Sequence, residues 1–231
     1  MIIEVKNLYV KYESEYAVKN LSFGVNAGER VAVMGPNGAG KSTLFLAMTG
    51  VLPCDAGTVT IDGISLNKKN LRLLRRCVGL LFQNPDDQLF MPTVYEDIAF
   101  GPRNFGLPET EIDERTNEIL DGLGALPLKT RLIHQLSGGE KRLIALAGLL
   151  VLRPSALLLD EPTAFLDPRG SRRLAEILLQ LPQTLLLATH DAAFSAKVCG
   201  RVMLMKNGGI FADANADEIL GDEKLLLESG L

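Results

Sequence analysis

Short runs of apolar residues, bounded by Gly, Asn and Pro, fill the first third of the chain and predict buried β-strands. They are residues 1–5, 22–25, 30–34, 57–63 and 78–82. Residues 30–34 are rich in β-branched side chains, which is typical of a strand, whereas 57–63 alternate between apolar and polar positions like an edge strand. Residues 41–49 predict a helix that ends at Gly50.

The pattern changes further along the chain and becomes mostly helical from residue 93 to residue 152. Pro102, Pro108 and Pro127 interrupt it, so we expect several helices and not one. Because strand-like runs stand on both sides of this stretch, it predicts a helical subdomain, residues 87–154, inserted between strands of a common core.

Continuous apolar runs return at residues 156–160 and 184–189, as expected for parallel strands that are covered on both faces. The other elements predicted here are a helix at 170–181, a hairpin of 202–205 and 210–212 that turns at 207–209, and a helical tail at 216–231. The order of elements indicates one α/β domain over residues 1–231, whose core is formed by 1–86 and 155–231.

Composition and charge narrow the class of protein. The chain has 231 residues, of which 47% are hydrophobic and 23% charged, and its net charge of -4 disfavours a broad nucleic-acid surface. The longest apolar run, 143–152, is shorter than the ~20 residues that a spanning helix needs. The N-terminus lacks a signal-peptide layout. We interpret the basic clusters at 72–76 and 172–173 as solvated helix faces.

The segment Gly35-Pro-Asn-Gly-Ala-Gly-Lys-Ser-Thr43 follows a predicted strand and opens a predicted helix, and it matches the phosphate-binding loop pattern. Glycines let backbone N–H groups approach phosphate oxygens, Lys41 adds a positive charge, and Ser42 carries the hydroxyl that ligates Mg²⁺. A plain glycine-rich turn before a helix would not require the Lys-Ser pair. The candidate triphosphate contacts are Asn37, Gly38, Ala39, Gly40, Lys41, Ser42 and Thr43.

Two adjacent carboxylates follow the predicted strand 156–160. Asp160 ends that strand, so its carboxylate is expected at the carboxyl edge of the sheet, beside the phosphates, where it can hold Mg²⁺. Glu161 would point toward an attacking water and act as its general base. An Asp-Glu pair after an apolar run is often only a strand end entering a turn, but the phosphate loop upstream favours the functional interpretation.

Together with these motifs, Leu136-Ser-Gly-Gly-Glu140 resembles the signature of the ATP-binding-cassette ATPases, and the resemblance covers essentially the whole chain. It implies an α/β fold of the P-loop NTPase kind: a nucleotide-binding core with a mixed or parallel sheet, an antiparallel β subdomain, and an inserted α-helical subdomain. It also implies an ATPase that uses ATP and Mg²⁺. In this family, two subunits form a head-to-tail dimer that sandwiches ATP, which favours a homodimer here.

The resemblance also assigns roles to single residues. Tyr12 matches the aromatic that stacks on adenine, and Gln83 matches the loop glutamine that senses Mg²⁺ and the γ-phosphate. His190 matches the histidine that contacts the γ-phosphate. The residues expected to reach the ATP of the second subunit, or to cross the interface with it, are Ser137, Gly138, Gly139 and Asp167. Two positions depart from the family pattern, Glu140 in place of a commoner Gln and Phe165 in place of a small residue.

Two further segments, Gln83-Asn-Pro-Asp-Asp-Gln-Leu-Phe90 and Phe100-Gly-Pro-Arg103, resemble the ATPases of energy-coupling-factor and cobalt/nickel (CbiO-like) importers. This implies a peripheral subunit on the cytoplasmic face of the cell membrane. Its partners would be a transmembrane scaffold and a small membrane protein that captures a vitamin such as biotin or a metal ion. Asp86 and Asp87 would pair with scaffold arginines, unless they form only an acidic surface loop. The short chain slightly favours the metal-ion or biotin systems.

Other classes of function remain open to different degrees. A soluble cassette ATPase acting in cofactor assembly or on nucleic acid is the main alternative. DNA-repair relatives would carry long coiled coils and translation-factor relatives two cassettes, and neither feature is present. A nucleotide-dependent interaction module that barely hydrolyses ATP is disfavoured by Glu161. The signature excludes a P-loop kinase, and the transported solute cannot be read from this chain.

Overall fold

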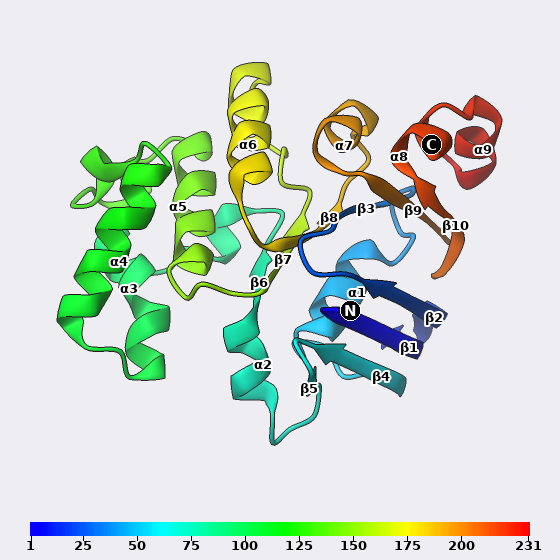
Figure 1. Ribbon diagram of the computed structural model, residues 1–231, viewed down its shortest axis with the longest axis horizontal. Coiled ribbons are helices and arrows are strands. Elements are labelled where there is room, and N and C mark those ends of the chain that lie inside the picture. Colours follow the sequence, from blue (N-terminus) through cyan, green and yellow to red (C-terminus); the bar gives the residue numbers. More distant parts are fainter.

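The computed structural model describes residues 1–231, and its centre is a six-stranded sheet of order β10-β9-β3-β8-β7-β6 (Figure 1). Its strands are β3 (Arg30–Met34), β6 (Val78–Leu81), β7 (Ala156–Asp160), β8 (Thr184–Ala188), β9 (Arg201–Lys206) and β10 (Gly209–Asn215). All neighbours in this sheet are parallel except β9 and β10, which form the predicted antiparallel hairpin. The continuous apolar runs therefore did indicate central parallel strands.

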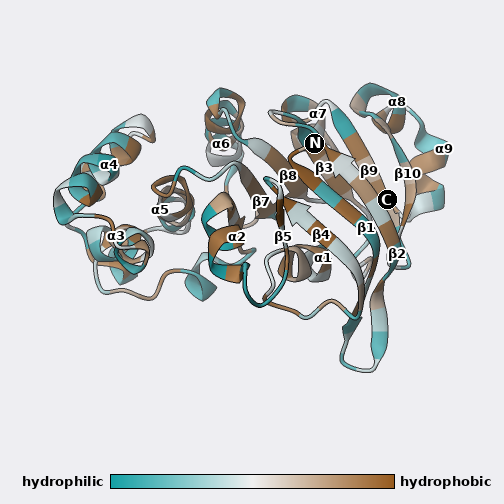
Figure 2. Cartoon of the chain, turned by 60° about the horizontal axis from the view of Figure 1, so that its bottom comes forward, coloured by the Kyte–Doolittle hydropathy of each residue, from teal (hydrophilic) through white to brown (hydrophobic).

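Both faces of this sheet are buried, because successive side chains of a strand point to opposite sides. Val31 and Val33 of β3 join one apolar cluster, and Ala32 and Met34 join the other. Helix α1 (Lys41–Met48) covers the first face and lies between the two sheets of the molecule. Figure 2 shows the central strands in brown and the outer helix α4 (Glu109–Gly122) largely in teal.

The second sheet is antiparallel and has the order β2-β1-β4-β5. Its strands are β1 (Ile3–Tyr12), β2 (Glu15–Val25), β4 (Ala56–Ile61) and β5 (Ile64–Ser65). The prediction of an edge strand at 57–63 was wrong at its carboxyl end. There β5 pairs with Thr60 and Ile61, a partner that the alternation of a single strand does not reveal.

The helical stretch contains α3 (Val94–Phe105), α4, and α5 (Gly138–Leu150), with 3₁₀ turns η2 (Leu126–Leu128) and η3 (Ile133–Gln135), and a further 3₁₀ turn, η1 (Pro85–Asp87), precedes it. Thr93 and Glu96 close a capping box at the start of α3, and Pro108 stands at the N-cap of α4. In Figure 1, α3 and α4 lie at one end of the molecule, and α5 stands between them and the central sheet. The prediction of several helices in this stretch is confirmed, but Pro102 does not interrupt the pattern as expected, since it lies inside α3.

The remaining helices are α2 (Leu71–Cys77), α6 (Pro168–Gln180), α7 (Ala192–Val198), α8 (Ala216–Leu220) and α9 (Glu223–Ser229). Helix α6 begins two residues before the predicted Gly170, because the Asp167 carboxylate accepts the Gly170 N–H and Pro168 occupies the first turn. None of the helices combines the length and the apolar character needed to cross a membrane.

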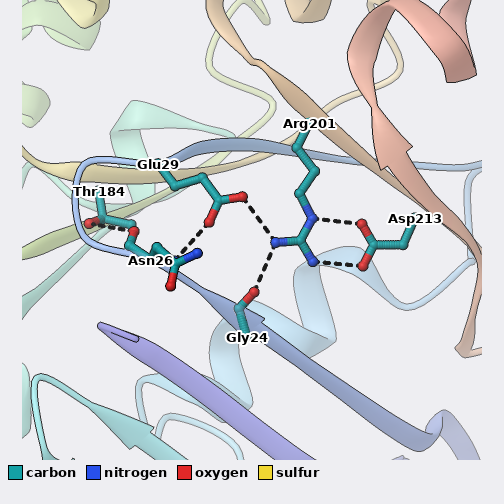
Figure 3. A network of polar contacts seen from close by, with 6 residues as sticks. All are labelled: Gly24, Asn26, Glu29, Thr184, Arg201 and Asp213. Atoms are coloured by element: carbon teal, nitrogen blue, oxygen red, sulfur yellow. Dashed lines mark hydrogen bonds and ion pairs between the residues drawn. The ribbon is translucent and has the colours of Figure 1, made fainter.

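Arginine side chains join distant parts of the core. Arg201 makes a bidentate contact of 2.7 Å with Asp213 and also reaches Glu29 at 3.0 Å and the Gly24 carbonyl at 2.9 Å (Figure 3). The prediction that Arg75 belongs only to a solvated helix face was wrong, since its Nε donates to the Thr49 carbonyl at the end of α1. These contacts connect segments that lie far apart in the sequence.

Candidate active site

The loop between β3 and α1 passes so close to neighbouring backbone that two of its glycines are obligatory. Gly35 has φ 150 and Gly40 has φ 99. A Cβ on Gly40 would lie 2.2 Å from the Ala17 carbonyl oxygen, and one on Gly35 would lie 2.2 Å from that of Met205. Helix α1 then starts without a side-chain cap, so its first N–H groups and its dipole are available to an anion.

Lys41, the first residue of α1, lies with its ammonium inside this loop. Its Nζ donates to the carbonyl oxygens of Gly35 at 2.6 Å and Pro36 at 3.1 Å. Burial lowers the pKa of Lys41, while the charges of Glu161 and Asp160 oppose that shift. The ammonium is therefore held between the loop and two carboxylates, next to the helix terminus.

A cavity of about 420 Å³ opens in front of this loop and brings together most of the predicted site. It is lined by Tyr12, Ala17, Asn37, Gly38, Ala39, Gly40, Lys41, Ser42, Thr43, Gln83, Asp160, Glu161 and His190. Parallel strands explain the convergence, since β3, β6, β7 and β8 all end at the same edge of the sheet and each delivers a loop there. Tyr12 comes from the other sheet and is 55% exposed.

Asp160 ends β7 with its carboxylate buried and incompletely bonded. Its Oδ1 atom is inaccessible to solvent and has no hydrogen-bond partner. Burial raises the pKa of Asp160, and the Ser42 hydroxyl beside it works in the opposite direction. An unpaired buried carboxylate oxygen next to a hydroxyl is a donor set that suits Mg²⁺, a cation that prefers oxygen ligands.

Glu161 is held at both carboxylate oxygens. Its Oε1 lies 2.9 Å from Nδ1 of His190, and its Oε2 accepts the Thr189 hydroxyl at 3.2 Å. Its φ of 41 is a left-handed value that is uncommon for a non-glycine residue and costs about 1–3 kcal/mol. The motif analysis missed Thr189, for which the only sequence signal is its place between strand β8 and His190.

A second group of predicted residues lies elsewhere. Ser137, Gly139 and Asp167 line a separate cavity of about 310 Å³ between the starts of α5 and α6, and Gly138 is exposed beside it. The structure therefore does not bring these four residues to the cavity of Lys41. The residues around Lys41 and the residues around Ser137 therefore line two separate cavities of the same chain.

The start of α5 explains the Glu140 variant. Ser137 caps the helix by accepting the Glu140 N–H at 3.3 Å, and a Glu140 carboxylate oxygen accepts the Ser137 N–H at 2.7 Å. The hydrogen bond from the Ser137 hydroxyl, followed by that from its N–H, lowers the pKa of Glu140. Glutamate therefore closes the capping box that the start of this helix needs.

Phe165, which stands where the family pattern has a small residue, is unusual for a large apolar side chain in both its backbone conformation and its exposure to solvent. Its side chain is 74% exposed and its φ is 65, an outlier for a bulky residue. It lies in the loop between Glu161 and Asp167. The Asp167 side chain itself caps α6 by accepting the Gly170 N–H at 2.6 Å.

Comparison with known proteins agrees with this geometry. A family model described as ABC transporter matches residues 18–164. The energy-coupling factor transporter ATP-binding protein EcfA of Methanothermobacter thermautotrophicus is 44% identical over 236 residues, covering 100% of this chain and 76% of that protein.

Two solved structures share the whole fold. CbiO1 from Clostridium perfringens, described as part of the ABC transporter complex CbiONQ, has a TM-score of 0.87 at 37% identity. The match covers 98% of this chain and 93% of the CbiO1 chain. The cassette MJ0796 was solved as a dimer in a post-hydrolysis state bound to ADP and phosphate, and it has a TM-score of 0.83 at 26% identity. The match covers 93% of this chain and 98% of the MJ0796 chain.

Proposed function

Because this chain belongs to the ABC transporter family, we propose that it is the ATP-hydrolysing subunit of an importer of the energy-coupling-factor type. It is an ATP-binding protein and an ATPase that converts ATP and water to ADP and phosphate, coupled to transport. The observation that carries the proposal is the separation of two residue sets, one around Lys41 and one around Ser137, into two cavities of one chain.

The separation supports a head-to-tail dimer of two copies. In such a dimer, the Ser137 cavity of one subunit faces the Lys41 cavity of the other, and ATP lies between them. At the N-terminus of α5, Ser137 already accepts the Glu140 N–H, so the N–H groups of Gly138 and Gly139 are the second set of donors to the triphosphate. Asp167 and Phe165 lie beside the Ser137 cavity, so we place them in the interface. The dimeric structure of MJ0796 supports this assembly.

The predicted site residues of the Lys41 cavity then have defined roles. The loop N–H groups and Lys41 bind the phosphates, and Tyr12 stacks on the adenine. Glu161 accepts a proton from the attacking water, whose oxygen forms a bond to the γ-phosphorus as the bond to the β-phosphate oxygen breaks. His190 and Thr189 keep the Glu161 carboxylate in one orientation, which their distances of 2.9 and 3.2 Å support.

Mg²⁺ fits the same cavity. Ser42, Asp160 and Gln83 would hold it, and the unpartnered Asp160 Oδ1 supports this assignment. When bound, the ion neutralises charge on the β- and γ-phosphates.

We place the subunit on the cytoplasmic face of the membrane, docked on a transmembrane scaffold through the segment after Gln83. Phe90 and Phe100 form an edge-to-face pair with centroids 4.8 Å apart, and both rings are exposed. Asp86 is already paired with Lys141 at 2.6 Å, whereas Asp87 has no ion pair. Asp87 is thus the carboxylate better placed for a scaffold arginine.

The complete importer would also contain a small membrane protein that captures the solute. We propose a transition-metal ion such as cobalt or nickel as the solute, which rests on the resemblance of residues 83–90 and 100–103 to the cobalt/nickel type of importer. A vitamin such as biotin is the other solute that the same resemblance allows.

Affinity purification of this chain from solubilised native membranes, with partners identified by mass spectrometry, tests the proposal. We expect a polytopic scaffold and a small membrane protein in the eluate. Asp87→Arg as a second bait should recover less scaffold, while Glu114→Arg, on the exposed face of α4, serves as the charge control. Recovery of soluble partners alone, while other membrane complexes survive, would instead assign the chain to the soluble cassette ATPases.

A further inference from the structure

Arg142 is a charged side chain buried almost completely inside the molecule. It lies in α5, close to Ser137, and is 1% exposed. Its Nη1 donates to the Phe82 carbonyl at 2.6 Å, and its Nη2 donates to the Gln83 carbonyl and, at 3.4 Å, to that of Ala164. A buried charge is costly unless it is hydrogen-bonded, so these carbonyls are what keeps the guanidinium in place.

The three carbonyls belong to two loops that carry proposed site residues. Phe82 and Gln83 follow β6, and Ala164 lies between Glu161 and Asp167. Arg142 itself belongs to the helix whose start carries Ser137. One guanidinium therefore connects segments that carry residues of the Lys41 cavity with segments that carry residues of the separate Ser137 cavity.

Neighbouring contacts attach the loop after β6 to α5 at two more points. Gln88 accepts the Phe82 N–H at 3.2 Å and donates to the Ala145 carbonyl at 3.1 Å. Lys141 pairs with Asp86 at 2.6 Å. Residues 82–88 are thus fixed to α5 along their length, and Arg142 supplies the hydrogen bond from α5 to the loop that contains Ala164.

We infer that Arg142 is a positioning residue. It makes residues 82–88, the loop between Glu161 and Asp167, and helix α5 move as one unit, and thereby sets the rate of ATP hydrolysis. The inference rests on the proposed function, because it takes these three segments as parts of the ATP sites. Arg142 borders the Ser137 cavity, but its Nη donors are turned toward backbone carbonyls, so it acts through the loops. The planar guanidinium presents its donors in a fixed fork that suits several acceptors in set positions, whereas a lysine ammonium is a single point charge on a flexible stem.

Arg142→Met and Arg142→Lys, made in the full chain, test this role. We expect Arg142→Met to lower kcat about 10- to 100-fold, since small misplacements of reacting groups have effects of that size. KM should change less than about threefold, because Arg142 does not line the Lys41 cavity. Arg142→Lys, which keeps one donor group, should fall between Arg142→Met and the native protein.

Backbone hydrogen exchange distinguishes a positioning role from a general loss of stability, because a general loss would speed exchange throughout the chain and not in the two loops alone. We expect faster exchange in residues 82–88 and 162–167 of the Arg142 variants and unchanged exchange in the strands. Leu146→Ala, which removes a buried apolar side chain of the same helix, is the matched control for lost stability. If the Met variant does not fold, the Lys variant is measured in the same way.

Two results would overturn the inference: a loss of kcat no larger than that of Leu146→Ala at equal folded fraction, or an exchange increase spread evenly over the chain. Either would make Arg142 an ordinary packing residue. Both measurements use the isolated ATPase. A failure to recover a membrane scaffold would therefore count against the importer and leave the role of Arg142 standing.

Discussion

The Nδ1 atom of His190 lies 2.9 Å from Oε1 of Glu161. Together with the Thr189 hydroxyl on Oε2, this contact leaves the Glu161 carboxylate little freedom to rotate. It also leaves the other imidazole nitrogen, Nε2, available to a phosphate. His190 thus makes an orienting contact to the proposed general base, which the sequence did not reveal, and the phosphate contact expected from the sequence stays a prediction for its Nε2.

Substitution of His190 separates these two contacts. An Asn side chain places its amide near the position of Nδ1, and a Gln side chain places it near that of Nε2. If orientation of Glu161 dominates, His190→Ala should lower kcat about 100-fold with little change in KM, and Asn should restore more activity than Gln. Steady-state ATPase kinetics measure this. Better rescue by Gln would show that the phosphate contact matters more.

Removal of the Glu161 charge should stop turnover without preventing ATP binding. We expect Glu161→Gln to lower kcat at least ~100-fold, because the amide cannot accept the proton of the attacking water. The variant should accumulate as an ATP-bound dimer, visible by size-exclusion chromatography with light scattering. Asp191→Asn, which changes a nearby carboxylate that caps α7, should remain active, hydrolyse its bound ATP and not accumulate as a dimer. Substantial hydrolysis by Glu161→Gln would contradict the general-base role.

Tyr12 should contribute to ATP affinity and not to the chemical step. Tyr12→Ala removes a stacking platform worth about 1–3 kcal/mol and is expected to raise the KM for ATP about tenfold at constant kcat. Tyr12→Phe keeps the ring and should behave like the native protein. Tyr16→Ala is the control, because Tyr16 packs edge-on against Tyr9 and does not line the cavity. Equal KM values for Tyr12→Ala and Tyr16→Ala would exclude adenine stacking.

The capping box at the start of α5 predicts a pH dependence of stability. The pKa of Glu140 is lowered in the folded protein, so its contribution is present at pH 7 and is lost as the pH falls through that lowered value. Glu140→Gln should cost about 0.5 kcal/mol at pH 7, where the charge favours the helix N-terminus, and little at pH 3. Thermal unfolding at both values measures this. Glu114→Gln, which removes an unpaired charge of α4, should show no such difference.

The Arg201 network predicts a stability effect that leaves the site intact. Arg201→Ala removes the bidentate contact to Asp213 and the bonds to Glu29 and Gly24 shown in Figure 3. We expect a loss of about 2 kcal/mol in the free energy of unfolding, measured by urea titration. Affinity for ATP should not change. Glu118→Ala, which breaks an exposed pair with Arg153, should cost less than about 0.5 kcal/mol.

The parallel strands and the phosphate loop were predictable because their signals are local. A continuous apolar run marks a strand covered on both faces, and Lys41 follows Gly40 directly in the sequence. Helix α7 was not predicted, because seven residues are too few to show a helical period. The pairing of β4 with β5 was missed because the alternation of apolar and polar residues along β4 does not show which strands lie beside it.

The sequence by itself determined the order of the motifs, the kind of sheet and the residues able to bind a triphosphate, since each follows from contiguous residues. The resemblance implied that Ser137 and Lys41 serve different ATP sites, but only the tertiary structure decided which cavity each one lines. It also decided that Arg142 reaches the Phe82 carbonyl 60 positions away. The physical reason is that a backbone carbonyl accepts a hydrogen bond whatever its side chain, so such a contact depends on folding and leaves no pattern in the sequence.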